Sequence, residues 1–319
     1  MQYRFFTRIG IQFIVGIPIY IRLVEIPSRI ENKEHFSVRA RRMKKIILTL
    51  SIAIFFTGVA VAKPGGLRLR SESAIVLDAE HGNVIYGKDA DKIRPIASIT
   101  KLMTAMVVLD AKLPLNEKIT IRSADVDRIK NTRSRLSLGA KLTREELLLL
   151  SLMSSDNRAA AALGRTYPGG KKAFVKAMNN KAFELGMGNS FFVESTGLSS
   201  RNVSTARDLA KLVEAAHNYK IIRKCTTTAV HSIKLPHRKR SLLYKNSNSL
   251  VRRGAWDIDV SKTGFLKAAG RCLVMRAQIV GKPVIIVLLD SWGKNTRIGD
   301  ANRIKKWMEK SNRFKTHNG

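Results

Sequence analysis

Apolar strand patterns lie toward both ends of residues 63–310 and enclose a long helical stretch, and this order constrains the fold more than any other feature. Short strands are predicted at 74–78 and 83–86, and a hairpin of two longer strands at 271–280 and 283–289. Apolar residues at three- and four-residue spacing occupy much of the chain between them. Strands at both ends with helices between them favour one sheet covered by helices, so we expect an α+β fold.

The helices expected between these strands carry their own start and stop signals. Thr143 and Glu146 match a capping box, and Ser204 is expected to cap a later helix. The hairpin near the C-terminus is expected to turn at Gly281-Lys282. The predicted helices cover residues 97–109, 147–152, 158–163, 171–185, 204–216 and 301–310. We therefore predict a single domain over 63–310, followed by a basic tail, 311–319.

Residues 43–62 have the three parts of a secretory signal peptide. Lys44 and Lys45 form the basic start, an apolar run follows over 46–59, and a small-x-small cleavage site ends at Ala62. A membrane anchor is the alternative, but the apolar run is near the lower length limit for a bilayer span. We therefore expect cleavage after Ala62 and export of the mature protein.

Residues 1–42 precede this signal and are interpreted as an upstream extension. Their apolar stretch, 10–20, is interrupted by Pro18 and is too short to span a bilayer. Use of an upstream start codon in place of Met43 would explain the segment, so no fold is assigned to it.

The charge of the chain indicates an anionic partner. The sequence has 58 Lys and Arg against 24 Asp and Glu, a formal net charge of +34. Removal of residues 1–62 leaves 48 basic and 21 acidic residues, a formal +27. Because an exported protein rarely meets nucleic acid, we expect no nucleic-acid partner. The basic surface instead predicts a loose association with anionic polymers of the cell envelope.

The cysteines and histidines argue against a metal site. Two cysteines, Cys225 and Cys272, exclude a disulfide-dense scaffold and a four-cysteine zinc site. The six histidines include no His-x-x-x-His or His-x-His pair, so neither a metal nor a zinc peptidase is expected. Whether the two cysteines form a disulfide stays open, because the sequence gives no distance between them.

Ser98 and Lys101 form a Ser-x-x-Lys pair at the start of a predicted helix. A spacing of three residues places both side chains on one helical face, within contact range. A serine hydroxyl is a poor nucleophile unless a base takes its proton. A lysine amine can be that base when burial or a nearby cation lowers its pKa. The pair therefore indicates a serine nucleophile at a helix N-terminus, where backbone N–H groups favour an oxyanion.

Two further motifs follow along the chain. Ser155-Asp156-Asn157 lies at the junction of two predicted helices, and its hydroxyl and amide could pass a proton or hold an amine or carbonyl. Lys262-Thr263-Gly264 lies just before the C-terminal strand pair. Its lysine and hydroxyl could bind a substrate carboxylate, while its glycine would let the substrate backbone lie against the strand. Each motif alone is weak, but their order is informative.

The order Ser-x-x-Lys, Ser-Asp-Asn, Lys-Thr-Gly is that of class A β-lactamases and penicillin-binding proteins. The sequence resembles the low-molecular-mass penicillin-binding proteins, and in particular the D-alanyl-D-alanine endopeptidases of the penicillin-binding protein 7 type. The resemblance covers residues 71–308. The stretches that carry it are RPIASITKLMTAMVVLDAKLPLNEK, LMSSDNRAAAAL, YPGGKKAFVKAMN, FVESTGL, NVSTARDLAKL and SKTGFLKAAGRCLVMRA.

This resemblance implies a β-lactamase/transpeptidase-like fold, with an antiparallel sheet covered by helices in a single catalytic domain. It also implies a periplasmic serine D,D-endopeptidase that cleaves D-alanyl cross-links between peptidoglycan stem peptides. Such an enzyme would be acylated covalently by β-lactams and would need no cofactor.

By the same resemblance, Ser98 would be the acylated nucleophile and Lys101 its general base. Ser155 and Asn157 would line the cleft, with Ser155 helping to protonate the departing amine. Asp156 is a variable position in such enzymes, so it receives no role.

The third motif would bind the substrate. Lys262 and Thr263 would hold the carboxylate beside the scissile bond, next to Gly264, and Lys262 would keep the amine of the catalytic lysine partly neutral. The backbone N–H groups of Ser98 and Phe265 would form the oxyanion hole.

Three other functions remain open. A D-alanyl-D-alanine carboxypeptidase would use the same residues on uncross-linked stem peptides. A β-lactamase would need a deacylating base such as the Glu-x-x-Leu-Asn pattern, and Glu214 with Asn218 has the spacing but ends a predicted helix. A binding protein for an anionic envelope polymer, without chemistry, would be explained by the charge alone.

Overall fold

The computed structural model describes residues 66–235 and 240–316. These residues belong to one compact unit, 64–319. The predicted extension, 1–42, and the predicted signal peptide, 43–62, lie outside the described residues.

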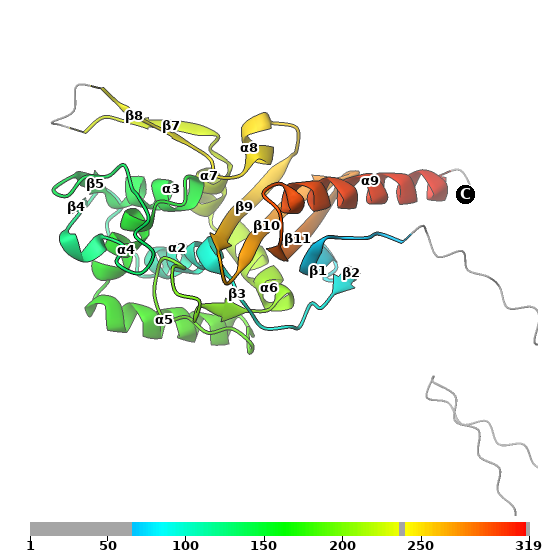
Figure 1. Ribbon diagram of the computed structural model, residues 1–319, viewed down its shortest axis with the longest axis horizontal. Helices are drawn as coiled ribbons and strands as arrows, with labels where there is room; N and C mark the ends of the chain where they lie inside the picture. The colour runs from blue at the N-terminus through cyan, green and yellow to red at the C-terminus, as the bar shows by residue number, and fades with distance from the viewer. Residues whose placement is uncertain (1–65, 236–239, 317–319) are drawn as a thin grey trace, which may run out of the picture. The chain divides into compact units, whose positions relative to one another are not determined.

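A five-stranded sheet forms the core of this unit, with strand order β2-β1-β11-β10-β9. Every neighbouring pair is antiparallel, as expected, and the first strand in chain order, β1, pairs with the last, β11 (Figure 1). Strand β9 lies at one edge of the sheet. The strands are β1 (Ser71–Asp78), β2 (Val84–Lys88), β9 (Ile258–Leu266), β10 (Gly270–Ile279) and β11 (Lys282–Ser291).

Helices cover both faces of the sheet, which confirms the α+β expectation. Helix α6 (Ala206–His217) and helix α9 (Thr296–Thr316) both contact β10 and β11 (Figure 1). Alternate residues of β1 enter different cores: Ile75 packs in the larger core, and Val76 in a smaller one with Ile304 of α9. Because strand side chains alternate between faces, a strand buried on both faces reads as a nearly continuous apolar run.

The larger core extends into a helical region centred on α2 (Thr100–Asp110), whose residues from Thr100 to Val108 are all buried. A helix that is apolar nearly all round belongs inside a protein, and burial of its first turn places Lys101 in the interior. Around α2 lie α3 (Arg144–Met153), α4 (Asn157–Arg165), α5 (Gly170–Glu184), α7 (Lys220–Thr227) and the short α8 (Ser249–Arg253).

Short elements complete the described part of the chain. The 3₁₀ turns are η1 (Ala97–Ile99) and η2 (Ser123–Asp125). Three small antiparallel pairs are β3 (Arg94–Pro95) with β6 (Val203–Ser204), β4 (Lys118–Thr120) with β5 (Lys141–Thr143), and β7 (Val230–Ile233) with β8 (Leu242–Lys245).

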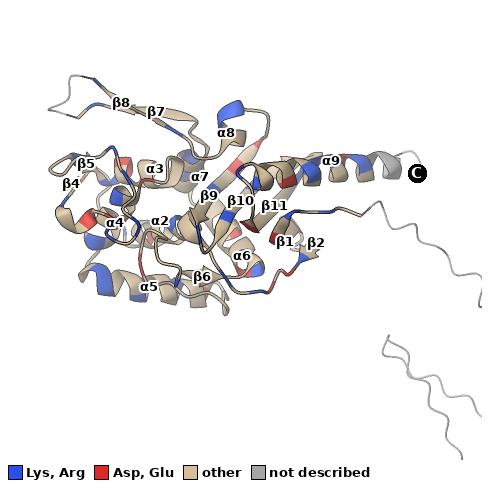
Figure 2. Cartoon of the chain, viewed as in Figure 1, with Lys and Arg blue, Asp and Glu red and all other residues tan. Residues whose placement is uncertain are grey.

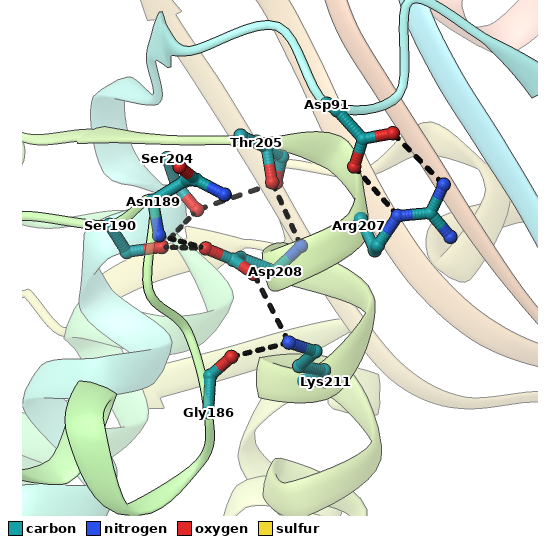
Figure 3. A network of polar contacts seen from close by, with 9 residues as sticks. All are labelled: Asp91, Gly186, Asn189, Ser190, Ser204, Thr205, Arg207, Asp208 and Lys211. Carbon is teal, nitrogen blue, oxygen red and sulfur yellow. Dashed lines mark hydrogen bonds and ion pairs between the residues drawn. The ribbon is translucent and has the colours of Figure 1, made fainter.

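One capping prediction is confirmed and the other is wrong. Thr143 and Glu146 form the expected capping box at the start of α3. Helix α6 is capped by Thr205, whose side chain accepts a hydrogen bond from the Asp208 amide at 3.1 Å, and not by Ser204 (Figure 3). Ser204 lies one residue too early because it is still paired in strand β6. The Asp208 carboxylate then accepts hydrogen bonds from the loop before it, which ties that loop to α6.

The C-terminal region differs from the sequence expectation in three details. The β10–β11 hairpin turns at Val280-Gly281, with φ of 52° and 71°, and not at Gly281-Lys282, because Lys282 already pairs with Ile279. A turn with two positive φ angles suits the right-handed twist of a hairpin. Helix α9 continues to Thr316, through most of the predicted basic tail. The Lys-Thr-Gly motif lies inside β9, a strand that the apolar pattern did not indicate.

Both cysteines are buried and free, Cys225 on α7 and Cys272 on β10. Among the helices of residues 66–235 and 240–316, none combines the length and the apolar character that crossing a bilayer requires.

Candidate active site

Ser98 lies in η1, immediately before α2, and Lys101 lies in the first turn of that helix. The Lys101 ammonium nitrogen Nζ is 3.0 Å from Ser98 Oγ, which confirms that the two side chains face each other. Ser98 is partly exposed, whereas Lys101 is fully buried. Ala97, just before the serine, has a φ of 47°, which is strained for a residue with a Cβ and is typical of functional turns.

Two more acceptors surround the Lys101 amine. Its Nζ is 2.8 Å from Asn157 Oδ1 and 2.5 Å from the Thr196 carbonyl oxygen. Burial lowers the pKa of Lys101 to about 8, while the carboxylate of Glu194 acts in the opposite direction. A neutral amine has two hydrogens and one lone pair. It can therefore donate to these two oxygens and accept the proton of the Ser98 hydroxyl.

The second motif connects α3 to α4. Asp156 caps α4 by accepting a hydrogen bond from the Ala159 amide at 3.0 Å, and it accepts another from Ser134 Oγ at 2.7 Å. Asp156 therefore stabilises the start of α4, and its charge also raises the pKa of Lys101. Asn157, the first residue of α4, points its amide oxygen at Lys101 and donates from Nδ2 to Thr132 Oγ1 at 2.8 Å.

Ser155 of this motif has a left-handed backbone, with a φ of 62°. Its side chain is partly exposed and lines a cavity beside Asn157. Within the described residues its hydroxyl has no protein partner, so it is available to a substrate.

The third motif reaches the nucleophile through the edge of the sheet. A Cβ added to Gly264 would lie 3.1 Å from the Ile96 carbonyl oxygen and 3.2 Å from the Ser98 nitrogen. The missing side chain makes room for η1. That Gly264 also lets a substrate backbone lie against the strand stays a prediction. The close approach brings β9 alongside Ser98.

Lys262 and Thr263 are buried at this edge. Lys262 Nζ donates to the Thr263 carbonyl oxygen at 2.9 Å, and Thr263 Oγ1 donates to Ser247 Oγ at 2.7 Å. Burial, and then the charges of Lys101 and Arg297, lower the pKa of Lys262 well below its ordinary value. We expected Lys262 to keep Lys101 neutral. Burial is instead the main cause at both lysines, and the repulsion within the pair lowers the pKa of Lys262.

The loop that contains Glu194 is a part of the site that motif reasoning missed. The Glu194 carboxylate accepts hydrogen bonds from the amides of Thr196, at 2.6 Å, and Gly197, at 2.7 Å. A Cβ on Gly197, whose φ is 80°, would lie 2.1 Å from the Ala97 carbonyl oxygen. The loop thus packs directly against the turn that carries Ser98. The stretch FVESTGL was visible in the sequence, but nothing in it indicated this contact.

Buried Asn202 holds the Glu194 loop from the other side. Its Nδ2 donates to Glu194 Oε1 at 2.9 Å and to Thr100 Oγ1 at 3.1 Å. The Ser200-Arg201-Asn202 triplet therefore resembles the second motif in sequence, but its asparagine stabilises the Glu194 loop.

Arg297 was also missed. It lies in the first turn of α9, and its charge lowers the pKa of Lys262. Its Nε and one Nη are buried, and neither has a hydrogen-bond partner among the described residues. The sequence gives no signal for it, since it is one of many arginines. An unpaired guanidinium beside a buried lysine produces a local excess of positive charge.

Phe265, the second proposed oxyanion-hole residue, follows Gly264 on β9. This residue is 56% exposed, and the centre of its ring lies 4.4 Å from the Arg271 guanidinium carbon. Because β9 is an edge strand, alternate N–H groups along it face away from β10 and toward the side where Ser98 lies.

Two cavities flank these residues. One of about 570 Å³ is lined by Asn157, Glu194, Thr196 and apolar side chains that include Phe174. The other, of about 460 Å³, is lined by Ser155, Asn157 and basic residues. The described residues contain one group with metal-binding spacing, Asp78, Glu80 and His81. It lies in the exposed β1–β2 turn, where Asp78 Oδ1 accepts from the Glu80 amide.

Comparison with known proteins agrees with this geometry. Residues 58–293 match the S11 peptidase family, described as D-alanyl-D-alanine carboxypeptidase. The chain is 46% identical over 278 residues to a Pseudomonas aeruginosa protein named D-alanyl-D-alanine endopeptidase. The match covers 85% of this chain and 89% of that protein. An Escherichia coli protein of the same name is 47% identical over 274 residues, covering 84% and 88%.

A solved structure supports the fold. The crystal structure of a Streptomyces DD-transpeptidase superposes with a TM-score of 0.70 at 31% identity, covering 75% of this chain and 97% of that one. This similarity confirms the transpeptidase-like architecture that the family resemblance implies. The chain therefore belongs to the S11 family of D-alanyl-D-alanine serine peptidases.

Proposed function

We propose that this protein is a serine D,D-endopeptidase that hydrolyses D-alanyl cross-links in peptidoglycan through an acyl-enzyme on Ser98. The observation that carries the proposal is the buried Lys101 amine, 3.0 Å from Ser98 Oγ and with a pKa lowered to about 8. The relatives with 46% and 47% identity are both named endopeptidases, which favours cross-links over free stem peptides.

Acylation begins when the neutral Lys101 amine takes the proton from the Ser98 hydroxyl. Ser98 Oγ then attacks the carbonyl carbon of the D-alanine. The oxyanion that forms accepts hydrogen bonds from the backbone N–H groups of Ser98 and Phe265. The left-handed φ of Ala97 and the close approach of Gly264 hold these two segments beside each other.

Collapse of the tetrahedral intermediate breaks the bond to the leaving amine, which needs a proton. Ser155, whose hydroxyl has no partner in the described protein, passes this proton from the protonated Lys101 to the leaving amine. Asn157 Oδ1, 2.8 Å from Lys101 Nζ, keeps the amine in place. In deacylation a water molecule replaces the leaving amine, and Lys101 serves again as its base.

Lys262, Thr263 and Arg297 form the anion-binding side of the site. A carboxylate that enters here would stabilise both the unpaired Arg297 nitrogens and the buried Lys262. A carboxylate beside the scissile bond would satisfy them and would align the carbonyl carbon with Ser98. β-Lactams carry a carboxylate in the corresponding position, so we infer that they acylate Ser98 covalently.

A D-alanyl-D-alanine carboxypeptidase is the second candidate. It is favoured by the description of the matched family and by relatives of lower identity, such as a 32% identical Streptomyces protein named D-alanyl-D-alanine carboxypeptidase. Both activities use the same chemistry and differ only in the leaving group.

Digestion of purified muropeptides tests the proposal. The wild-type protein should convert cross-linked dimers to monomers, and Ser98→Ala should not, while Ser200→Ala, an exposed serine, serves as the matched control. Fluorescent penicillin should label wild type and the control but not Ser98→Ala. Release of terminal D-alanine with intact dimers would instead identify a carboxypeptidase. Labelling without turnover of either substrate would contradict both activities.

We further propose a periplasmic location, with cleavage of the signal peptide after Ala62. The charge of the mature chain supports a loose association with the anionic envelope: Lys and Arg are spread over several elements, including α5, α8 and α9 (Figure 2). N-terminal sequencing of the exported protein tests the cleavage site. Binding to sacculi should weaken steeply with salt, and salt-independent binding would count against the association.

A further inference from the structure

A basic groove lies beside the second motif. It is the cavity of about 460 Å³ bounded by residues 133–135, by 154–157, and by 243–245 of strand β8. Three distant segments of the chain thus form its walls, and one wall contains Ser155 and Asn157.

Hydrogen bonds hold these walls in position. Ser134 Oγ donates to Asp156 Oδ2 at 2.7 Å, which joins the first wall to the second motif. The Arg135 guanidinium donates to the Leu243 carbonyl oxygen and lies 5.5 Å from the centre of the Tyr244 ring, which joins the first wall to β8. The groove is therefore built by specific contacts and is not an accidental gap between loops.

The charge in the groove is strongly unbalanced. Arg133, Arg135 and Lys245 are exposed along its walls, and Asp156 is its acidic residue. Both Asp156 oxygens already accept hydrogen bonds from other groups. Among residues 66–235 and 240–316, neither Arg133 nor Lys245 has an ion-pair partner. Unpaired cations in a concave surface attract an anionic ligand and concentrate it there.

The groove adjoins the reacting groups on the side of the leaving amine. Asn157 contacts the Lys101 amine and also lines the groove. Ser155, which in the proposed mechanism protonates the leaving amine, lines the same cavity. A chain that continues from the leaving amine would pass over Ser155 and enter this groove.

We propose that the basic groove binds the leaving stem peptide of a cross-linked substrate through its free carboxylates, an inference that rests on the proposed endopeptidase function. In a carboxypeptidase reaction the leaving group is a single D-alanine, too short to occupy the groove. In an endopeptidase reaction it is a whole acidic peptide. Arg133 and Lys245 would therefore determine the preference for cross-linked over uncross-linked substrate.

The test compares Arg133→Glu/Lys245→Glu with the control Lys172→Glu/Lys176→Glu, which reverses two exposed charges on α5. Substrates are a cross-linked muropeptide dimer and the same dimer with the free carboxylates of its leaving stem peptide amidated, except the carboxylate beside the scissile bond that Lys262 and Thr263 bind. Acylation by fluorescent penicillin, which has no leaving peptide, verifies that each variant is folded and has an intact Ser98 centre.

We expect the groove variant to raise KM for the dimer about five- to tenfold at low salt, with kcat nearly unchanged. The increase should shrink in roughly 0.5 M salt, because salt screens exposed charges. It should disappear with the amidated dimer. The control should match wild type in every assay.

Two outcomes overturn the inference and are distinguishable from failure of the proposed function. If wild type cleaves dimers but the groove variant has the wild-type KM, the groove does not bind the leaving peptide. If both dimers respond equally to the substitution, the effect is not electrostatic. If wild type leaves dimers intact while reacting with penicillin, the endopeptidase function itself fails, and the inference fails with it.

Discussion

The lowered pKa of Lys101 predicts a specific pH dependence of acylation. Only the neutral amine can take the proton of Ser98, so the acylation rate should follow the neutral fraction of Lys101. With a pKa of about 8, roughly one-tenth of the protein is competent at pH 7 and roughly nine-tenths at pH 9. We therefore expect the second-order rate of acylation by penicillin to rise about tenfold between these pH values.

Burial accounts for the size of this effect. An exposed lysine, with a pKa of about 10.4, would be neutral in only about one molecule in 2,500 at pH 7. Placing Lys101 in the interior thus raises the competent fraction about 200-fold at that pH. Carboxylates nearby limit the gain, since Glu194 and Asp156 both raise the pKa of Lys101.

Stopped-flow measurement with fluorescent penicillin from pH 6 to 10 would locate the midpoint, which we expect near pH 8. Asp156→Asn keeps both the helix cap and a partner for Ser134 but removes one negative charge. Its midpoint should move to lower pH, whereas Asp91→Asn, at an exposed ion pair with Arg207, should leave the midpoint unchanged. A flat profile, or a midpoint near that of a free lysine, would refute Lys101 as the base.

Three further predictions concern stability and the cysteines. Gly197→Ala should lower the free energy of unfolding by about 3 kcal/mol or more, because its Cβ would overlap the Ala97 carbonyl; an unchanged urea midpoint would contradict this. Asp300→Ala should cost about 3 kcal/mol, since the buried carboxylate accepts hydrogen bonds from two amides and a hydroxyl of the β1 region, and urea unfolding measures it. Burial raises the pKa of Cys225 to about 12 and of Cys272 to about 11, so a thiol reagent at pH 8 should react with neither in the native protein and with both in denaturant. A single reactive thiol in the native state, or none after unfolding, would contradict the last prediction.

Local chemistry made the three motifs and most helices predictable. The three-residue spacing of Ser98 and Lys101 determines their contact in any helix, and the Thr143 capping box acts within four residues. The strands of the sheet followed from continuous apolar runs, except β9. That strand carries Lys262 and Thr263 at buried positions, so its sequence does not read as apolar.

The parts that could not be predicted depend on long-range contacts. Gly264 and Gly197 are ordinary glycines in the sequence, and only the fold brings each against the turn before Ser98. The effect of Glu194 on Lys101 joins positions 93 residues apart in the chain. Arg297 comes from α9, near the C-terminal end of the sequence, far along the chain from Ser98. Spacing rules contain no information on such contacts, because they arise from tertiary packing.

The Glu194 loop affects both the geometry and the electrostatics of the site. The Glu194 carboxylate binds the amides of Thr196 and Gly197, and this loop conformation places Gly197 against Ala97 and the Thr196 carbonyl beside Lys101. The same charge raises the pKa of Lys101. A neutral residue here would favour the reactive amine, yet it would also remove acceptors from buried amides and release the strained turn. The carboxylate therefore fixes the position of Ser98 but reduces the neutral fraction of Lys101. Together with Asp156 and Asp127, it keeps the pKa of Lys101 near 8 and not lower.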